Sequence, residues 1–189
     1  MSQPAVLIGV TGGIAAHKAA TLVSMLVQDG LDVKVIQTQA SMQFVGSATF
    51  AALSGHGVAT KIFDDARFPL GAHIELAQQC QVLCVAPASA NMLAKMALGL
   101  ADDLLSTTYL CFTGPVIVAP AMNDQMWHHP AVKRNVARLN DDGVQIIEPQ
   151  DGWLSCRQMG QGRMAEPDTI RQRIHDIVRQ VVGTTLNKT

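Results

Sequence analysis

The sequence has little charge, and its charges form no run of one sign. Only 15% of its 189 residues are charged, and 14 Lys and Arg nearly balance 15 Asp and Glu. Nucleic acids and acidic membrane surfaces attract basic patches, so this balance argues against both partners. No apolar run reaches the roughly 18 residues that cross a bilayer. The N-terminal MSQPAVLIGVTGG also lacks the basic region and cleavage site of a signal peptide, so we expect a cytoplasmic protein.

Cysteine is scarce and irregularly spaced. The four cysteines, Cys80, Cys84, Cys111 and Cys156, form no CxxC pair and no regular spacing with the six histidines. This disfavours a disulfide framework and a zinc site, and we predict no metal. We expect Cys80, Cys84 and Cys111, which lie in or beside apolar runs, to be buried as small hydrophobic side chains. Cys156 lies instead in the glycine-punctuated segment GWLSCRQMGQGRM (residues 152–164), which we expect to be a mobile loop.

Apolar residues make up 48% of the chain and fall in short runs that alternate with amphipathic segments. The predicted strands are residues 5–10, 32–38, 81–87, 115–121 and 144–149. The predicted helices are residues 14–30, 89–110 with a break near Gly99, 129–143 and 167–182. Apolar strands that alternate with helices indicate an α/β fold, a doubly wound parallel sheet between two helical layers. We expect a single domain over residues 1–189, with a frayed polar tail at about 183–189.

The turn after the first strand has the features of a phosphate site. In GVTGGIAAHK, Gly12 and Gly13 precede a helix, where backbone amides can bind an anion. The turn lacks the GxGxxG spacing, and the second strand ends without the acidic residue that holds an adenosine ribose. It is followed instead by Thr38 and Ser41, whose hydroxyls suit a terminal phosphate. This favours a mononucleotide such as FMN over NAD, although a plain tight turn with capping hydroxyls is the alternative.

Three more motifs follow the predicted strands. They are PASAN (residues 87–91), PAMN (residues 120–123) and the Cys156 segment with GQGRM. Ligands bind beyond the carboxyl ends of the strands in such sheets, so the positions suit a binding site. Taken singly, each has a simpler interpretation: Ser89 and Asn91 as helix caps, Asn123 as a turn residue, and the methionines as core filler.

Together and in this order, the motifs resemble those of the flavin-containing cysteine decarboxylases. The likeness runs from about Val6 to Pro167. PASAN is similar to the flavin-binding loop of that family, PAMN to its substrate clamp, and the Cys156 segment to its flexible flap. His73, in GAHIEL, matches the active-site histidine. The resemblance implies a flavodoxin/Rossmann-like fold, non-covalently bound FMN, and a homotrimer or an assembly of trimers with active sites at subunit interfaces.

The likeness is greatest to the members that act in coenzyme A biosynthesis. It implies decarboxylation of 4'-phosphopantothenoylcysteine to 4'-phosphopantetheine. Oxidation of the substrate to a thioaldehyde would place the carboxylate β to a C=S group and let it leave, with FMN as the electron acceptor. The ligase of that pathway is often fused downstream, and because this sequence ends at Thr189 we expect a stand-alone decarboxylase whose ligase is a separate protein.

The resemblance also implies site residues. His73 would act as a base or carry a proton near the substrate, and Asn123 would orient the substrate. Cys156 would donate the final proton from a loop that closes over the substrate and opens again. The implied catalytic residues are His73 and Cys156. The implied substrate-binding residues are Met122, Asn123, Gly162 and Arg163. The implied cofactor-binding residues are Gly12, Gly13, Ile14, Thr38, Ser41, Ser89, Ala90, Asn91, Met92 and Ala121.

Some positions depart from the family pattern, and other functions remain open. Arg157 follows Cys156 where the family usually has glycine, and Met92 replaces a common threonine. A guanidinium beside a thiol favours the thiolate, which cannot donate a proton. The alternatives are a peptidyl-cysteine oxidative decarboxylase, a non-catalytic FMN-binding regulatory protein and a flavin prenyltransferase. The Cys156 flap argues against the first, the lack of long acidic extensions against the second, and the clamp and flap together against the third.

Overall fold

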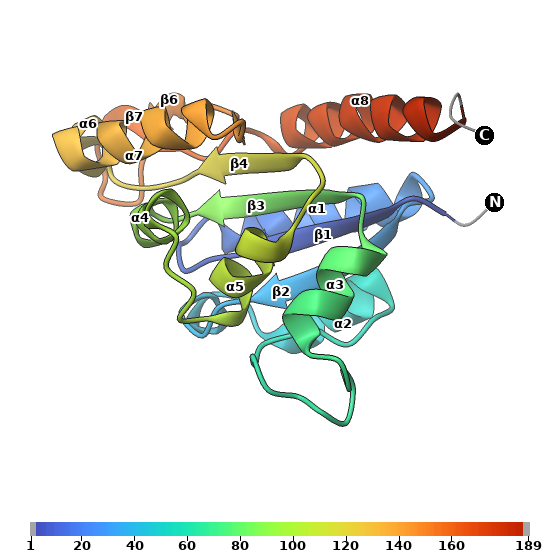
Figure 1. Cartoon of the computed structure of the whole chain (residues 1–189). Helices are drawn as coiled ribbons and strands as arrows, with labels where there is room; N and C mark the ends of the chain where they lie inside the picture. The colour runs from blue at the N-terminus through green and yellow to red at the C-terminus, as the bar shows by residue number, and fades with distance from the viewer. Residues whose placement is uncertain (1–2, 187–189) are drawn as a thin grey trace.

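A five-stranded parallel sheet forms the centre of the protein (Figure 1). The structure is a computed structural model, and it describes residues 3–186. In spatial order the strands are β2 (Asp32–Gln37), β1 (Ala5–Val10), β3 (Val82–Ala88), β4 (Val116–Pro120) and β5 (Gln145–Ile146). The order 2-1-3-4-5 is that of flavodoxin-like sheets, and it confirms the predicted doubly wound α/β fold.

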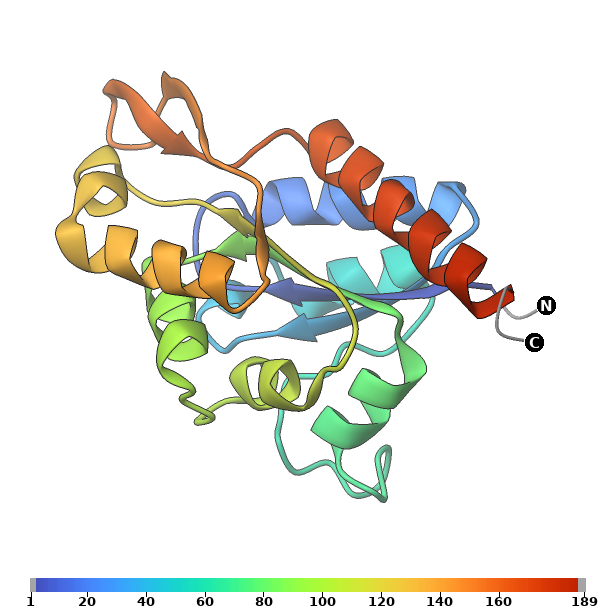
Figure 2. The same cartoon turned by 45° about the horizontal axis from the view of Figure 1, so that its top comes forward.

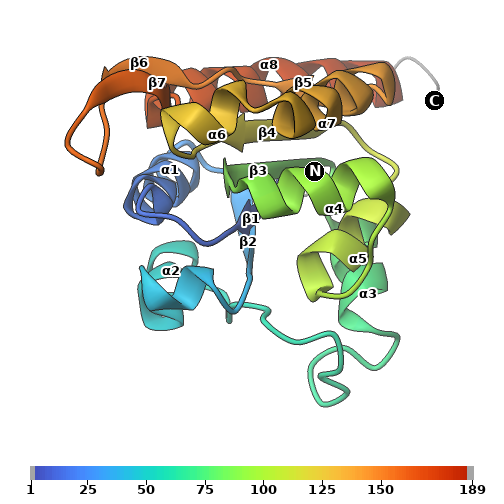
Figure 3. The same ribbon diagram turned by 90° about the vertical axis from the view of Figure 1, so that its left-hand side faces the viewer.

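Helices cover both faces of this sheet. One layer contains α1 (Ala16–Gln28), α2 (Ser47–Ser54) and α8 (Pro167–Leu186). The other contains α3 (Ala72–Gln79), α4 (Ala90–Leu98), α5 (Leu104–Cys111), α6 (Asp124–His128) and α7 (Pro130–Asp141). Figure 3 shows α1 and α2 on one side of the sheet and α3, α4 and α5 on the other. The protein therefore has three layers, as the sequence predicts.

The central strands are buried because every side chain on them meets a helical layer. All six residues of β1 are buried. Val6, Ile8 and Val10 enter one hydrophobic core, and Ala5 and Leu7 enter the other, on the opposite face. This is the alternation that a strand imposes on successive side chains. The result is a rigid sheet whose carboxyl edge can position loops.

Several elements differ from the sequence prediction. The predicted strand 144–149 is reduced to the two residues of β5, and the last helix continues past residue 182 to Leu186. Residues 187–189 of the expected frayed tail lie outside the described residues. The short α2, α3 and α6 and a 3₁₀ turn, η1 (Ser41–Gln43), have no predicted counterpart. Helices of five to eight residues are too short to show a clear apolar period.

The segment around Cys156 is a β-hairpin. Strands β6 (Gln150–Trp153) and β7 (Met159–Arg163) pair antiparallel beside the main sheet's carboxyl edge (Figure 2). The strand residues are mostly exposed, so their sequences QDGW and MGQGR carry no apolar alternation. The expectation of an irregular loop applies only to the tip, residues 154–158.

Candidate active site

A cavity of about 510 Å³ opens at the carboxyl ends of β1 and β3. The segments that follow β1, β3 and β4 line it, and the β6–β7 hairpin covers it. In the 2-1-3-4-5 order, β1 and β3 flank the point where the winding reverses, and ligands of such sheets bind there. Of the residues implied by the resemblance, the cavity brings together Gly12, Gly13, Ile14, Ser89, Ala90, Ala121, Met122, Asn123, Cys156, Gly162 and Arg163.

The turns after β1 and β3 are joined by one hydroxyl. Thr11, which is buried, donates from Oγ1 to the Pro87 carbonyl at 2.7 Å and accepts from the Ser89 backbone N–H at 2.8 Å. Ser89 in turn caps α4, its Oγ accepting from the Met92 N–H at 3.3 Å. Thr11 was not among the residues predicted from the sequence, although a hydroxyl directly after an apolar strand was the available signal. These bonds fix the two turns at the cavity floor relative to each other.

Glycine at position 12 is a steric requirement. A Cβ there would lie 2.6 Å from the Ala40 Cβ, in the loop after β2. At Gly13 a Cβ would meet nothing within 4 Å, so that position borders open space. The first glycine thus allows two loops to approach, and the second leaves the backbone accessible to a ligand.

Four of the implied cofactor residues do not line the cavity: Thr38, Ser41, Asn91 and Met92. Ser41 is fully buried, and its hydroxyl donates to the Thr38 carbonyl at 2.7 Å inside their own turn. Met92 is 2% exposed and packs in the hydrophobic core, because it lies on the inward face of α4. Asn91 points away from that core and is exposed.

Asn123 is held so that one end of its amide faces the flap. Its Oδ1 accepts from the Gln125 N–H at 2.9 Å and caps α6. Because a backbone N–H only donates, this bond identifies the oxygen and leaves Nδ2 as the free end. Nδ2 donates to the Cys156 Sγ at 3.5 Å. The helix cap and the thiol contact therefore use opposite ends of the same side chain.

The base of the hairpin is attached to the PAMN turn. The Met122 N–H donates to the Gly162 carbonyl at 3.0 Å, and the Asp124 Oδ1 accepts from the Gln161 N–H at 2.9 Å. A Cβ on Gly162 would collide with the Met122 carbonyl oxygen, so only glycine permits this approach. The clamp and the flap form one connected unit.

At the hairpin tip, Arg157 has a left-handed backbone with φ of 63°. Its N–H donates to the Leu154 carbonyl, and the Leu154 N–H donates to the Gln158 carbonyl, both at 2.9 Å. Glycine adopts this conformation at the least cost, which explains why glycine suits the position. Cys156 is exposed beside it.

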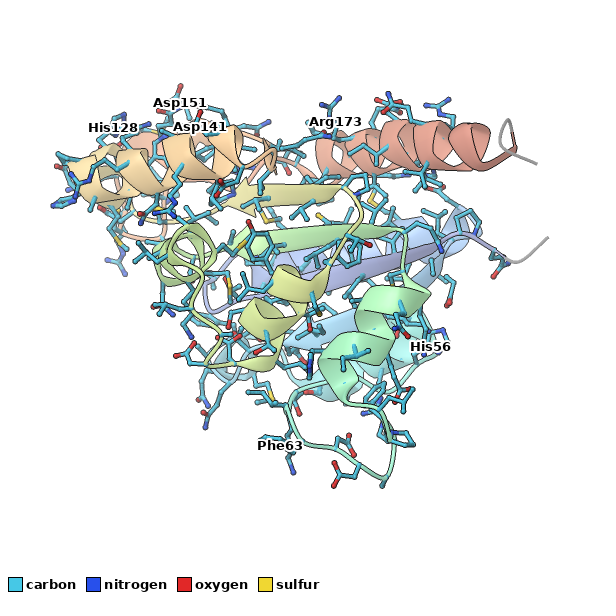
Figure 4. All side chains as sticks on the ribbon, viewed as in Figure 1. His56, Phe63, His128, Asp141, Asp151 and Arg173 are labelled. Atoms are coloured by element: carbon cyan, nitrogen blue, oxygen red, sulfur yellow. The ribbon has the colours of Figure 1, made fainter. Side chains whose placement is uncertain are left out.

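His73 lies outside the cavity. It is on α3, and Figure 3 shows α3 and the β6–β7 hairpin on opposite sides of the sheet. The loop that precedes α3 carries the exposed Phe63, and Figure 4 shows Phe63 at the far end of the molecule from Asp151 of β6. The His73 Nδ1 is buried without a hydrogen-bond partner in the described structure.

Of the three cysteines expected to be buried, two are buried and Cys111 is not. Cys80 and Cys84 are buried, and burial raises the pKa of each thiol to about 12. Cys111 is exposed, because it ends α5 at the surface, with its Sγ 3.4 Å from the His73 carbonyl oxygen. The apolar run before it predicts the helix but not which face its last residue takes.

Two cations that line the cavity share a carboxylate. Lys18 Nζ and an Arg163 terminal nitrogen lie 3.1 and 2.5 Å from the Glu166 Oε1. The hydrogen bond and the charge of Lys18, followed by the charge of Arg163, hold the pKa of Glu166 below its usual range. Lys18 and Glu166 were not among the implied residues, and their spacing in the sequence gives no sign that they meet.

Among the described residues, no group of three or more His, Cys, Asp or Glu side chains is arranged to hold a metal ion. No helix in residues 3–186 combines the length and the apolar character needed to cross a membrane.

The model of the flavoprotein family matches residues 1–179, nearly the whole chain. The chain belongs to the flavoprotein family. This flavoprotein is 49% identical over 165 residues to the coenzyme A biosynthesis bifunctional protein CoaBC of Bacillus subtilis (strain 168). It is 39% identical over 176 residues to the CoaBC protein of Haemophilus influenzae. These matches cover 87% and 93% of this chain but 41% and 44% of the relatives, so the chain spans about two fifths of their length.

Two solved structures resemble this flavoprotein over nearly their full length. A PPC decarboxylase mutant complexed with pantothenoylaminoethenethiol is 31% identical, with a TM-score of 0.81, and the match covers 92% of this chain and 97% of that one. The FMN-dependent cysteine decarboxylase SpaF is 30% identical, with a TM-score of 0.83 and coverage of 95% and 98%. The flavoprotein thus matches the decarboxylase structures as a whole domain.

Proposed function

We propose that this flavoprotein is an FMN-dependent decarboxylase that converts 4'-phosphopantothenoylcysteine to 4'-phosphopantetheine in coenzyme A biosynthesis. The observation that carries the proposal is the Cys156 thiol 3.5 Å from the Asn123 amide, at the cavity beyond β1 and β3. The name of the Bacillus relative gives the pathway, and the PPC decarboxylase structure gives the reaction class. The hairpin favours this reaction over the alternatives because it places a proton-bearing group over the cavity.

The cavity fits FMN. Its volume, about 510 Å³, is within the range of cofactor pockets. Gly13 borders open space, and the exposed Ile14 and the small Ala90 and Ala121 offer apolar surface to a flat ring. The turn at Gly12 and Gly13, separated by two residues from the start of α1, presents backbone N–H groups of the kind that bind a phosphate. When bound, FMN supplies the electron acceptor that the decarboxylation of a cysteine requires.

Asn123 would orient the substrate. Its oxygen caps α6 and its Nδ2 faces Cys156, so the side chain presents a donor toward the cavity. A donor fixed by a helix cap suits a carboxylate, which only accepts. Met122 and Gly162, joined by a backbone hydrogen bond, would form the wall behind that group.

Cys156 would deliver a proton to the product carbon. The thiol is exposed at the hairpin tip, on the segment that covers the cavity. A group on a flap can reach the reacting carbon while the flap is closed and leave with it when the product departs. The exposed Arg157 beside it is the feature least suited to this role, since a guanidinium favours the thiolate.

His73 would act in the cavity of a neighbouring copy. It does not line the cavity of its own chain, and its buried Nδ1 has no partner among the described residues. The His73 side chain as a whole is only partly buried, and we infer that its accessible part contacts a second copy or its substrate. This supports a homotrimer, or an assembly of trimers, in which each active site combines Asn123 and Cys156 of one chain with His73 of the next.

The experiment that tests the function compares three substrates on the FMN-loaded protein. They are 4'-phosphopantothenoylcysteine, pantothenoylcysteine and a peptide that ends in cysteine. We expect CO₂ release to be fastest with the first. Release from the peptide alone would contradict the proposal and indicate peptidyl-cysteine chemistry. No release from any of the three by a yellow protein would contradict catalysis of this class.

A further inference from the structure

The cations that line the cavity are partly neutralised by one residue behind them. Among the described lining residues, Lys18 and Arg163 are the Lys and Arg side chains, and none is an Asp or Glu. The Glu166 Oε1 accepts from both, at 3.1 and 2.5 Å. Two cations against one carboxylate leave the site with one excess positive charge. Such a site attracts an anion.

Lys18 and Arg163 are held differently. The Lys18 side chain is 13% exposed, and its Nζ also donates to the Met164 carbonyl at 3.2 Å. The Arg163 side chain is 43% exposed, and it lies across Gly152, where a Cβ would be 3.3 Å from its Cδ. Lys18 is thus fixed by two acceptors. The guanidinium of Arg163 has five N–H donors, most of which the contact with Glu166 does not use.

We propose that Glu166 is a positioning residue that occupies Arg163 until an anionic group of the substrate, a phosphate or a carboxylate, replaces it. Arg163 then turns its planar donor fork to two ligand oxygens, and Lys18 keeps Glu166 paired. The exchange costs little free energy, because the Arg163 and Glu166 side chains are 43% and 42% exposed and exposed ion pairs are weak. This inference rests on the proposed function, whose substrate carries both kinds of anion.

The decisive variant is Glu166→Gln in the FMN-loaded protein. Glutamine keeps an oxygen acceptor for Lys18 but removes the charge that competes for Arg163. We expect the KM for 4'-phosphopantothenoylcysteine to fall by about two- to five-fold, the range set by an exposed ion pair. Glu148→Gln makes the same charge change at an exposed residue outside the cavity lining, and it should leave the KM unchanged. An unchanged or higher KM in Glu166→Gln would show that Glu166 only braces the hairpin.

Binding measurements identify which anion is recognised. Calorimetry with 4'-phosphopantetheine, which has the phosphate but no carboxylate, should show tighter binding to Glu166→Gln if Arg163 takes the phosphate. A lower KM for pantothenoylcysteine, which has only the carboxylate, would assign Arg163 to the carboxylate. A change in FMN affinity, with neither pantothenoyl ligand affected, would overturn the inference because the site would belong to the cofactor.

Two further results distinguish a failure of the proposed function from a failure of the role proposed for Glu166. Arg163→Gln should raise the KM for the phosphorylated substrate, and a thermal unfolding curve like that of the unmodified chain shows that each variant is folded. If the unmodified chain releases no CO₂ from 4'-phosphopantothenoylcysteine, the proposed function fails. If it does so normally while Glu166→Gln has a raised KM, only the role of Glu166 fails.

Discussion

Asn123 caps α6 with its oxygen and contacts the Cys156 thiol with its nitrogen. Asn123→Asp keeps an oxygen to cap α6 but replaces the donor that faces Cys156 with a negative charge. We expect kcat/KM for decarboxylation to fall by about a hundredfold or more, the usual effect of losing one oriented donor. Thermal stability should change little. Steady-state kinetics and a melting curve measure both.

Asn123→Ala is the matched control, because it removes the cap as well as the donor. It should lose activity and also about 1 kcal/mol of stability, the usual value of a helix cap. If Asn123→Asp retained normal turnover, the donor would have no part in the reaction.

At the level of elements, Asp124 connects the clamp to the flap. Its carboxylate accepts the Gln161 N–H at 2.9 Å. Asp124→Ala should leave this amide without its partner and weaken the hairpin attachment by about 1 kcal/mol. Hydrogen exchange at Gln161 should then be about fivefold faster, while strands β1 and β3 exchange as before.

Asp124→Asn provides the comparison, since its amide oxygen can still accept from Gln161. It should retain most of the protection. Equal exchange rates at Gln161 in the unmodified chain and in Asp124→Ala would show that the hairpin is held by other contacts.

One carboxylate, at the C-cap of α1, links the end of that helix to α8. Asp29 bonds to Arg171 at 2.6 Å through each of its oxygens and to His175 at 2.6 Å. The hydrogen bond from Arg171, then that from His175, lowers the pKa of Asp29 to about 2. Because the pKa is lower in the folded chain than in the unfolded chain, the stabilisation is complete above about pH 4 and is lost as the pH falls towards 2.

Asp29→Asn should therefore destabilise the chain by about 1 kcal/mol at pH 7, a value reduced for the partial exposure of the pair. The difference between the two proteins should shrink between pH 4 and pH 2. Denaturant unfolding at a series of pH values measures it. A difference that stays constant down to pH 2 would mean that the carboxylate charge is not what joins the helices.

For the molecule as a whole, the sequence predicts the central sheet better than it predicts the hairpin and the ion pair beside the cavity. β1 and β3 are recognisable because long apolar runs are buried on both faces, and their turns follow directly. The hairpin is exposed and lacks such a pattern, and the meeting of Lys18 with Glu166 joins residues 148 positions apart. Local periodicity carries no information about either. His73 matches a motif, but no feature of the sequence shows that it lies outside the cavity of its own chain.

The proposal that neighbouring copies share each active site gives a prediction at the level of the assembly. His73→Asn and Asn123→Asp should each be inactive alone. If each site combines His73 and Asn123 from different copies, random mixing of equal amounts makes both residues intact in about a quarter of the sites. Co-expression with two tags, followed by purification of the mixed trimers, should restore about a third of the activity, because the purification removes the homotrimers and each mixed trimer keeps one intact site in three. Background activity in the mixed oligomers would place both residues in the same chain's site.

The most direct test of the central claim is the mass of the product that the FMN-loaded protein and its Cys156→Ser variant form from 4'-phosphopantothenoylcysteine. The unmodified chain should yield a product that has lost only CO₂. The variant, which lacks the thiol proposed to donate the proton, should yield a product lighter by a further two hydrogens. The same fully reduced product from both proteins, at the same rate, would contradict the role of Cys156 and of the hairpin that carries it.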